Sequence, residues 1–421
     1  MQKFQSVRGM HDILPEEIPQ WRGVEETFRR VCARANFAEI RTPVLEHTEL
    51  FSRASGESSD VVVTKQMYSF DGLDGDSYTL RPEGTASVVR SYVQHSLNQR
   101  GQVNKLFYIF PIFRYEAPGA GRYRQHHQCG IELLGAKDAN ADAEVLSLAR
   151  DFLNELGVFP TLRLNTLGTR ESRRAYVESL RAHLEPNRQH LSEDSQRRFE
   201  LNPLRIFDSK DARDHEALEG APRLLDHVRA HDAESSEHFD KLCGFLQELD
   251  IPFEIDHNLV RGFDYYSRTA FEWVSDKLGA QSTVLGGGRY DGLVEELGGQ
   301  PTPGIGFGCG IERLLLVRAA SEAPPIEGKR LTAFVVALGN AAKAATPRLV
   351  RAVRQSGLSC DCDLAGRKFG KQMDEANRSR ARFALIVGDD ELAQNAVALK
   401  DLDAGTQVVV PLSEACALMQ K

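Results

Sequence analysis

Alternate glycines between residues 304 and 310 constrain the folding of this chain more than any other feature. The run is Gly304-Ile-Gly-Phe-Gly-Cys-Gly310, and it continues as Ile311-Glu-Arg313. In an extended segment alternate residues share one face, so that face carries no side chains. We predict a strand with one bare face, followed by a helix from about Ile311 that projects Arg313 from its first turn. A flat adenine ring could pack against the bare face; the structural alternative is a glycine-rich strand packed tightly on a helix.

A long hairpin is predicted further upstream. Its strands are residues 106–116 and 125–135, and its tip, residues 117–124, is rich in glycine and arginine. Arg114 and Arg122 stand at the two ends of the tip, so both could face one ligand. Guanidinium groups bind phosphate oxygens bidentately, although arginines on hairpins are also ordinary surface residues. The sequence has no G-x-x-x-x-G-K-[ST] loop and no dinucleotide-binding glycine triplet, so a nucleotide would have to be held by arginines on strands.

The length of the chain, 421 residues, predicts two or three domains. Residues 21–37 repeat apolar positions at helical spacing and lead into an extended segment. Residues 170–230 are rich in Arg, Glu, His and Asp and interrupt a strand-rich pattern, which predicts a mostly helical insertion. The fold class expected for residues 1–325 is α+β with a mostly antiparallel sheet.

A second domain is predicted after a linker marked by Pro324 and Pro325. Strands and helices alternate beyond this linker, so residues 330–421 should form an α/β domain with a partly parallel sheet. The expected elements are strands at 331–338 and 383–387 and a helix at 343–355.

Positive charge is concentrated in this second domain. Residues 330–421 contain 13 Lys+Arg against 10 Asp+Glu, whereas residues 1–329 contain 39 against 50. Such a stretch suits contacts with phosphates, and the alternative is a solvated helix face. The cations that cluster are Arg367, Lys368, Lys371, Arg378, Arg380 and Arg382.

The seven cysteines are spread singly, apart from Cys360 and Cys362. The spacing of these two does not fit a zinc knuckle, and we interpret them as packed thiols and not as a metal site. Cysteines without paired spacings indicate a reducing compartment. The first 15 residues lack an apolar run of signal-peptide length, and no later stretch approaches about 20 apolar residues. We therefore expect a cytoplasmic protein.

Three segments together resemble the signature motifs of class II aminoacyl-tRNA synthetases. Residues 40–45 resemble motif 1, with its proline at Pro43; residues 114–116 resemble motif 2, and residues 308–313 resemble motif 3. Further segments narrow the resemblance to the histidyl-tRNA synthetase family over essentially the whole chain. These are Arg8-Gly-Met10 with Asp12, residues 79–85, residues 202–205 with 208–210, residues 259–266 with 269–273, and residues 286–293.

This resemblance implies a histidine–tRNA ligase that activates L-histidine with ATP and transfers it to the 3′ end of tRNA(His). It implies a class II catalytic domain at residues 1–325, with the helical insertion at 170–230, and an anticodon-binding domain at 330–421. Motif 1 implies a homodimer. Mg²⁺ is expected on the β and γ phosphates of ATP, although no cluster of metal ligands can be found in the sequence.

The resemblance also implies roles for particular residues. Arg114 and Arg261 are the expected catalytic residues, because both reactants are anions and positive charge must lie between them. Of these, Arg261 should contact the carboxylate and the α-phosphate, and Arg114 the α-phosphate. The expected ATP-binding residues are Arg114, Glu116 (at the adenine amino group), Arg122 and Arg313. The expected histidine-binding residues are Glu83, Thr85, Arg114, Gln128, Glu132, Arg261, Tyr265 and Tyr266.

Within the histidine set, Glu132 and Tyr266 are expected at the imidazole, since a carboxylate and a phenol can satisfy its donor and its acceptor. Arg367, Lys368 and Lys371 are expected to bind tRNA. His126 and His127 are adjacent on a strand, so they face opposite sides and are interpreted as structural.

One segment departs from the family pattern. After Glu116 the family usually carries an arginine and then a glutamine, which help to read an extra 5′ guanosine on the acceptor end. Here Ala117-Pro-Gly-Ala120 replaces them. We hypothesise that the tRNA lacks this guanosine or that either form is accepted.

Two other functions stay open. A catalytically inert paralogue that regulates the first enzyme of histidine biosynthesis would not need Arg114, Arg261 and Arg313 together. A class II synthetase for proline, threonine or glycine would share motifs 2 and 3 but not the segment 259–266.

Overall fold

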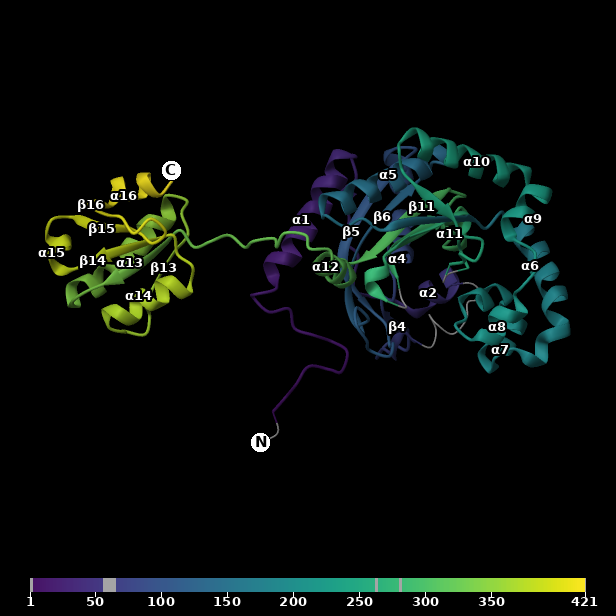
Figure 1. Cartoon of the computed structure of the whole chain (residues 1–421), viewed down its shortest axis with the longest axis horizontal. Coiled ribbons are helices and arrows are strands. Elements are labelled where there is room, and N and C mark those ends of the chain that lie inside the picture. Colours follow the sequence, from purple (N-terminus) through teal and green to yellow (C-terminus); the bar gives the residue numbers. More distant parts are fainter. Residues whose placement is uncertain (1–2, 56–65, 262–263, 280–281, 421) are drawn as a thin grey trace. The chain divides into compact units, whose positions relative to one another are not determined.

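The computed structural model describes residues 3–55, 66–261, 264–279 and 282–420, and it divides into two compact units, Met1–Ile326 and Glu327–Lys421. Figure 1 shows the helices and strands of each unit. Within the described ranges, no helix combines the length and apolarity needed to cross a membrane.

The large unit is built on an eight-stranded sheet in the order β1-β5-β6-β11-β10-β9-β7-β8. Neighbouring strands from β5 to β7 in this order are antiparallel, and only the pairs β1/β5 and β7/β8 of the eight-stranded sheet are parallel. The predicted α+β class with a mostly antiparallel sheet is confirmed. The strands are β1 (Ala38–Glu39), β5 (Asn104–Phe113), β6 (Gln125–Leu134), β7 (Thr161–Thr166), β8 (Phe253–Ile255), β9 (Ser267–Val274), β10 (Thr283–Arg289) and β11 (Gly304–Gly310).

One face of this sheet is covered by the helices α1 (Ile18–Arg34), α5 (Ala139–Glu155) and α12 (Ile311–Ala320). Phe28 of α1 packs edge-on against Phe107 of β5 and Phe307 of β11, with ring centroids 5.8 and 6.2 Å apart. Phe307 alternates along β11 with the glycines, which therefore lie on the opposite face. The predicted strand and the helix start at Ile311 are both observed.

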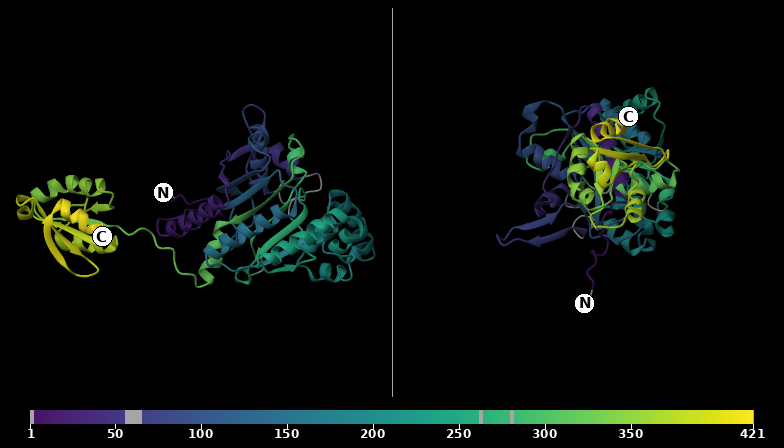
Figure 2. Two further views of the ribbon diagram at one scale, coloured as in Figure 1. Left: turned by 90° about the horizontal axis from the view of Figure 1, so that it is seen from above. Right: turned by 90° about the vertical axis from the view of Figure 1, so that its left-hand side faces the viewer.

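The segment predicted as a helical insertion contains four α-helices, and a fifth helix follows directly (Figures 1 and 2). The buried Oδ1 atom of Asp142 on α5 lies 3.2 Å from the Nε2 atom of His238 on this fifth helix. This contact links the fifth helix to α5, which covers the large sheet. The helices are α6 (Arg170–Leu184), α7 (Glu193–Leu201), α8 (Ala212–Ala217), α9 (Leu224–His231) and α10 (Ala233–Glu248), with short 3₁₀ helices η2 (Glu185–His190) and η3 (Pro203–Asp208).

A small antiparallel sheet in the order β2-β4-β3 stands beside the hairpin β5/β6 in the same unit. Several apolar side chains on and near it are exposed, namely Val44, Leu45, Phe70, Leu73 and Tyr115. The elements of this region and the remaining helices of the unit are β2 (Leu45–His47), α2 (Thr48–Ser55), β3 (Tyr68–Asp71), β4 (Ser77–Leu80), α4 (Thr85–Gln94), η1 (Leu97–Arg100), η4 (Asp276–Leu278) and α11 (Leu293–Glu296).

The small unit has a five-stranded sheet in the order β13-β12-β14-β15-β16, parallel over its first three strands and antiparallel over the last pairs. The predicted α/β class with a partly parallel sheet is confirmed. Cys360 and Cys362 lie on β13 as free thiols. The elements are β12 (Ala333–Ala337), α13 (Asn340–Gln355), β13 (Cys360–Cys362), α14 (Phe369–Arg378), β14 (Phe383–Val387), α15 (Asp389–Ala393), β15 (Ala396–Asp401), β16 (Gln407–Pro411) and α16 (Leu412–Met419).

Candidate active site

A cavity of about 300 Å³ opens on the glycine-bearing face of the large sheet. Its walls come from the hairpin β5/β6, from β10 and β11, from the first turns of α4 and α12, and from the segment that precedes β9. Side chains distant in sequence thus meet in one place. Ten of the predicted residues line it: Glu83, Thr85, Arg114, Glu116, Arg122, Gln128, Arg261, Tyr265, Tyr266 and Arg313.

The alternate glycines of β11 make room for polar side chains of the neighbouring strand β6. A Cβ atom at Gly306 would lie 2.2 Å from Oε2 of Glu132, and one at Gly308 would lie 2.1 Å from Nε2 of Gln128. On β10, a Cβ atom at Gly286 would lie 2.7 Å from the guanidinium of Arg261. These three polar side chains therefore occupy part of the bare face, and they fit there because the glycines have no Cβ atom. A ring could pack only against the rest of the face.

Glu132 lies beneath the cavity and is not part of its wall, since its side chain is fully buried. The hydroxyl of Thr85 donates to its Oε1 atom at 2.8 Å, and the hydroxyl of Tyr290 donates to its Oε2 atom. Burial raises the pKa of Glu132 to about 8, although the hydrogen bonds from Tyr290 and Thr85 oppose this shift. Glu132 is therefore largely protonated near neutral pH.

Tyr290 is a site residue that the sequence analysis did not single out. It is 1% exposed, and its ring packs edge-on against that of Tyr265 with centroids 5.9 Å apart. The signal was present in the quoted segment 286–293, of which Tyr290 is the aromatic member.

Glu83 both caps a helix and lines the cavity. Its carboxylate accepts the backbone N–H groups of Thr85 at 2.7 Å and Ala86 at 2.6 Å, at the start of α4. Burial raises the pKa of Glu83, and these two backbone hydrogen bonds act against the shift. Nearby, Nε2 of Gln128 donates to the hydroxyl of Tyr108 at 2.9 Å, which fixes the orientation of the amide.

Three residues of the hairpin tip bind one another in this structure. Glu116 pairs with the Nε atom of Arg122 and lies 3.8 Å from Nη1 of Arg114. Arg114 is also held by the carbonyl oxygen of Pro82, to which its Nε atom donates at 2.7 Å. The carboxylate of Glu116 is thus occupied by cations that could otherwise bind phosphate.

Two further arginines reach the cavity from other elements. Arg313 of α12 donates through Nε to the carbonyl oxygen of Gly121 at 3.2 Å and through Nη1 to that of Thr283 at 2.6 Å. Burial lowers the pKa of Arg313, and the nearby charge of Arg122 lowers it further. Its guanidinium therefore stands directly beside the hairpin tip.

Arg261 pairs with Glu272 on β9, and its guanidinium carbon lies 5.3 Å from the ring centroid of Tyr266. Burial alone would lower the pKa of Arg261, but interactions with Tyr266 and Glu272 outweigh it and raise the pKa. The hydroxyl of Thr283 also donates to Glu272 at 2.7 Å. Glu272 is thus a positioning partner that the sequence analysis missed, although it lies inside the quoted segment 269–273.

The two adjacent histidines face opposite sides of β6, as predicted. His127 lies away from the cavity, with Nδ1 3.1 Å from Oε1 of Glu312 and its ring edge-on to Trp21. His126 lines the cavity, and the interpretation of both histidines as structural stays a prediction. Burial lowers the pKa of His126 to about 3, with Arg114 adding to the shift, so its imidazole is neutral near pH 7.

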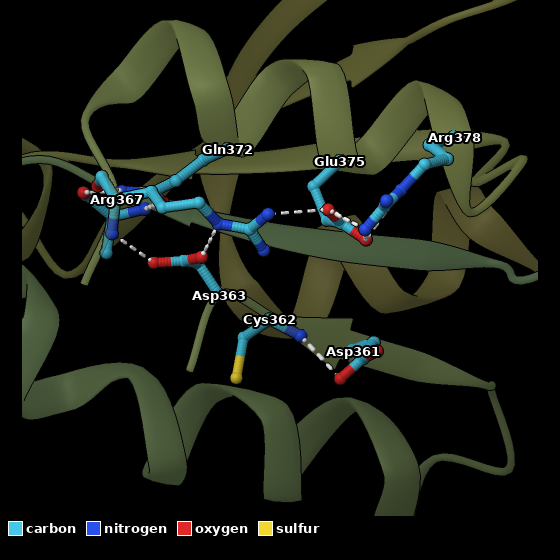
Figure 3. A network of polar contacts seen from close by, with 8 residues as sticks. Asp361, Cys362, Asp363, Arg367, Gln372, Glu375 and Arg378 are labelled. Atoms are coloured by element: carbon cyan, nitrogen blue, oxygen red, sulfur yellow. Dashed lines mark hydrogen bonds and ion pairs between the residues drawn. The ribbon is translucent and has the colours of Figure 1, made fainter. Parts of the chain in front are cut away.

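The predicted tRNA-binding residues lie in the small unit, where Arg367 is held by two carboxylates (Figure 3). Its guanidinium pairs with Asp363 and lies 2.7 Å from Oε2 of Glu375, which also binds Arg378. Lys368 and Lys371 are exposed, and Lys371 lies 3.2 Å from Asp374. Arg367 thus has mainly internal partners, whereas the two lysines reach outward.

Comparison with known proteins adds independent observations. Residues 9–314 match a family model described as histidyl-tRNA synthetase, and residues 332–421 match one described as anticodon binding domain. A histidine–tRNA ligase of Synechococcus sp. (strain JA-3-3Ab) is 49% identical over 97% of this chain and 96% of its own length. A histidine–tRNA ligase of Geobacillus thermodenitrificans (strain NG80-2) is 47% identical over 99% of this chain and 98% of its own length. The crystal structure of apo histidyl-tRNA synthetase from S. aureus superposes with a TM-score of 0.83 at 36% identity and covers 100% of both chains.

Proposed function

The chain belongs to the histidyl-tRNA synthetase family, and from that membership we propose how its cavity activates histidine and how its surfaces treat the tRNA. The matched family model spans more than half of the chain, and relatives 47–49% identical over nearly its whole length are histidine–tRNA ligases. The chain is accordingly an aminoacyl-tRNA synthetase specific for histidine, with ATP, histidine and tRNA as its substrates.

We assign the activation step to the arginines of the cavity. The carboxylate of histidine attacks the α-phosphorus of ATP, a phosphorus–oxygen bond forms, and pyrophosphate leaves, which yields histidyl-adenylate. Arg261 would lie between the carboxylate and the α-phosphate, and Arg114 at the α-phosphate. Each is held in place by a fixed acceptor, Glu272 and the carbonyl oxygen of Pro82. Pre-positioned cations stabilise the charge that develops in the transition state without reorganisation.

The observation that carries this proposal is that four arginines from three separate segments line one cavity. Arg122 and Arg313 would bind the outgoing phosphates. Because Glu116 pairs with Arg122 in this structure, the phosphates would draw Arg122 away and free the carboxylate for the adenine amino group. ATP binding would thus replace one ion pair by two contacts with the substrate.

Mg²⁺ fits this cavity as an ion that arrives with ATP. Among the described residues, no group of three or more His, Cys, Asp or Glu side chains is placed to hold a metal ion. Mg²⁺ commonly keeps several waters and binds substrate phosphates through few protein ligands. Bound to the β and γ phosphates, it would partly neutralise the charge of the leaving pyrophosphate.

For the amino acid, we assign Glu83, Thr85 and Gln128 to the α-amino group. The imidazole would enter beside Tyr265 and Tyr266 and meet Glu132 at the base of the cavity. Thr85 lines the cavity and donates to Glu132, so the imidazole would reach Glu132 beside Thr85. A buried carboxyl that needs a polar partner rejects apolar side chains by roughly 10⁴-fold or more.

The tRNA would be bound in part by the small unit, through Lys368 and Lys371 of the segment that begins α14. On the large unit, the hairpin-tip residues 117–120 are exposed and carry no polar side chain. This supports the proposal that the extra 5′ guanosine is absent from the tRNA or is not read here.

A homodimer is proposed from the motif 1 segment. Pro43, Val44 and Leu45 are all exposed, and Phe70 of the adjoining small sheet is 50% exposed. Contiguous exposed apolar side chains favour association. Sedimentation analysis tests this proposal, and a species with the mass of one chain at all concentrations would contradict it.

The decisive experiment for the activation step is ATP–pyrophosphate exchange with histidine, measured against proline, threonine and glycine. We expect exchange with histidine alone. Exchange with none of the four would instead favour an inert regulatory paralogue, a function that the ligase relatives do not support.

A further inference from the structure

Side chains of the helical insertion form hydrogen bonds with the segment that carries Arg261, Tyr265 and Tyr266. Arg173 of α6 donates through Nη2 to the carbonyl oxygen of Asp264 at 2.9 Å. Its Nη1 atom donates to the carbonyl oxygen of Tyr266. One guanidinium therefore holds two carbonyl groups, two residues apart, of the backbone that carries Tyr265 and Tyr266.

A second contact comes from the junction of α7 and η3. Nδ2 of Asn202 donates to Oδ1 of Asp264 at 3.0 Å. The neighbouring Arg205 donates to the carbonyl oxygen of Arg261 at 3.5 Å and pairs with Asp208 at 2.6 Å. The insertion thus contacts this segment at both described ends.

The geometry makes the position of the segment depend on the insertion. The carbonyl oxygen and the ring of Tyr266 belong to one residue, so a shift of the carbonyl moves the ring. Arg261 likewise has its carbonyl on the insertion side and its guanidinium against Glu272 and Gly286. Misplacement of a binding group by about 1 Å can cost about a hundredfold in rate.

We propose that Arg173 and Asn202 are positioning residues for histidine, because they hold residues 264–266 in the place where Tyr266, beside Arg261, meets the amino acid. This inference rests on the proposed roles of Arg261 and Tyr266. Neither positioning residue lines the cavity. Histidine affinity should therefore depend on how the insertion docks, whereas Arg114, Arg122 and Arg313, which lie on other elements, should keep their contacts with ATP.

The first test is ATP–pyrophosphate exchange by the full chain with Arg173→Gln, without tRNA. The KM for histidine should rise by about tenfold, equal to about 1.4 kcal/mol, while the KM for ATP changes by less than about twofold. Arg173→Lys should restore part of the affinity, since an ammonium can still donate to a carbonyl. Arg174→Gln is the matched control, because Arg174 is the exposed next residue on the same helix.

The second test does not depend on the folding of Arg173 variants. Asn202→Asp places a carboxylate against Asp264 and should raise the KM for histidine as well. Adding Asp264→Asn exchanges donor and acceptor, so the double variant should recover toward the wild-type value. A double variant no better than the single one would overturn the proposal.

Arg261→Gln distinguishes failure of the positioning role from failure of the proposed function. If Arg261→Gln abolishes exchange while Arg173→Gln keeps the wild-type KM for histidine, the positioning role is wrong and the proposed function stands. If Arg261→Gln leaves exchange unchanged, the assignment of the site itself fails.

Discussion

The hydroxyl of Tyr290 donates a hydrogen bond to Glu132, and the two residues are buried, at 1% and 0% exposed. Because a buried acceptor without its donor is costly, this pair fixes the orientation of Glu132. Thr85 supplies the second donor from the cavity wall. The carboxyl beneath the cavity is therefore held in a single orientation before any substrate arrives.

Replacement of Tyr290 by phenylalanine should weaken histidine binding without affecting ATP. The change removes one hydrogen bond and keeps the ring, and a buried acceptor left without its donor costs about 1–3 kcal/mol. We expect the KM for histidine in pyrophosphate exchange to rise by about tenfold or more, with an unchanged KM for ATP. Equal increases in both KM values would instead indicate a general loss of structure.

Replacement of Glu132 by glutamine should remove a pH dependence of stability. The folded-state pKa is raised to about 8, above the ordinary value of 4.5, so the folded chain binds more protons than the unfolded chain between these values. Stability contributed by this group is present below about pH 4.5 and is lost as pH rises through about 8, by up to about 1.4 kcal/mol per pH unit.

Glutamine has no charge to bury, so the variant should gain in melting temperature relative to the wild type as pH increases from about 5 to about 9. The difference between the two proteins is the quantity to measure, because other groups titrate equally in both. A difference that stays constant over this range would show that Glu132 is ionised throughout in the folded protein.

The alternate glycines show how far sequence reasoning reaches at this site. The strand, its bare face and the helix that follows are local consequences of residue spacing, and they were predicted correctly. The distance between Gly306 and Glu132 was not predictable, because it depends on the register between β11 and β6. Arg367 illustrates the same limit, since its ion pairs with Asp363 and Glu375 depend on the fold and were not predicted, while its binding of tRNA stays a prediction.

Asp142 and Arg289 should be among the most important residues for the stability of the large unit. Their ion pair is closed to solvent, and Arg289 also donates to the carbonyl oxygen of Ala136 at 2.9 Å. Asp142→Asn would leave the buried arginine with the partly exposed Asp291, 3.1 Å from its Nη1 atom, as its remaining counter-charge, at a cost of about 3 kcal/mol. Denaturant unfolding measures this loss. The apolar double variant Asp142→Leu with Arg289→Met is the control, and it should be closer to the wild type than the single variant.

Neutralising Lys368 and Lys371 together should raise the KM for tRNA in aminoacylation and leave pyrophosphate exchange unchanged, because exchange does not need tRNA. The salt dependence of tRNA binding should also weaken, because binding with fewer phosphate contacts releases fewer counterions. Arg367→Gln should chiefly lower the stability of the small unit, through the loss of its bonds to Asp363 and Glu375. If the double variant at Lys368 and Lys371 charges tRNA with wild-type kinetics, this surface is not the tRNA-binding surface.

The hairpin tip predicts how the enzyme treats the acceptor end of its tRNA. Reading a guanosine requires donors or acceptors at the base edge, and residues 117–120 offer only backbone groups and apolar side chains. Transcripts of tRNA(His) with and without the extra 5′ guanosine should therefore be charged with kcat/KM values within about threefold of each other, a difference of less than about 1 kcal/mol. Ala117→Arg with Pro118→Gln would place an arginine and a glutamine after Glu116, and this variant should prefer the transcript that carries the guanosine. A strong preference for that transcript by the unmodified enzyme would mean that another part of the protein reads the nucleotide.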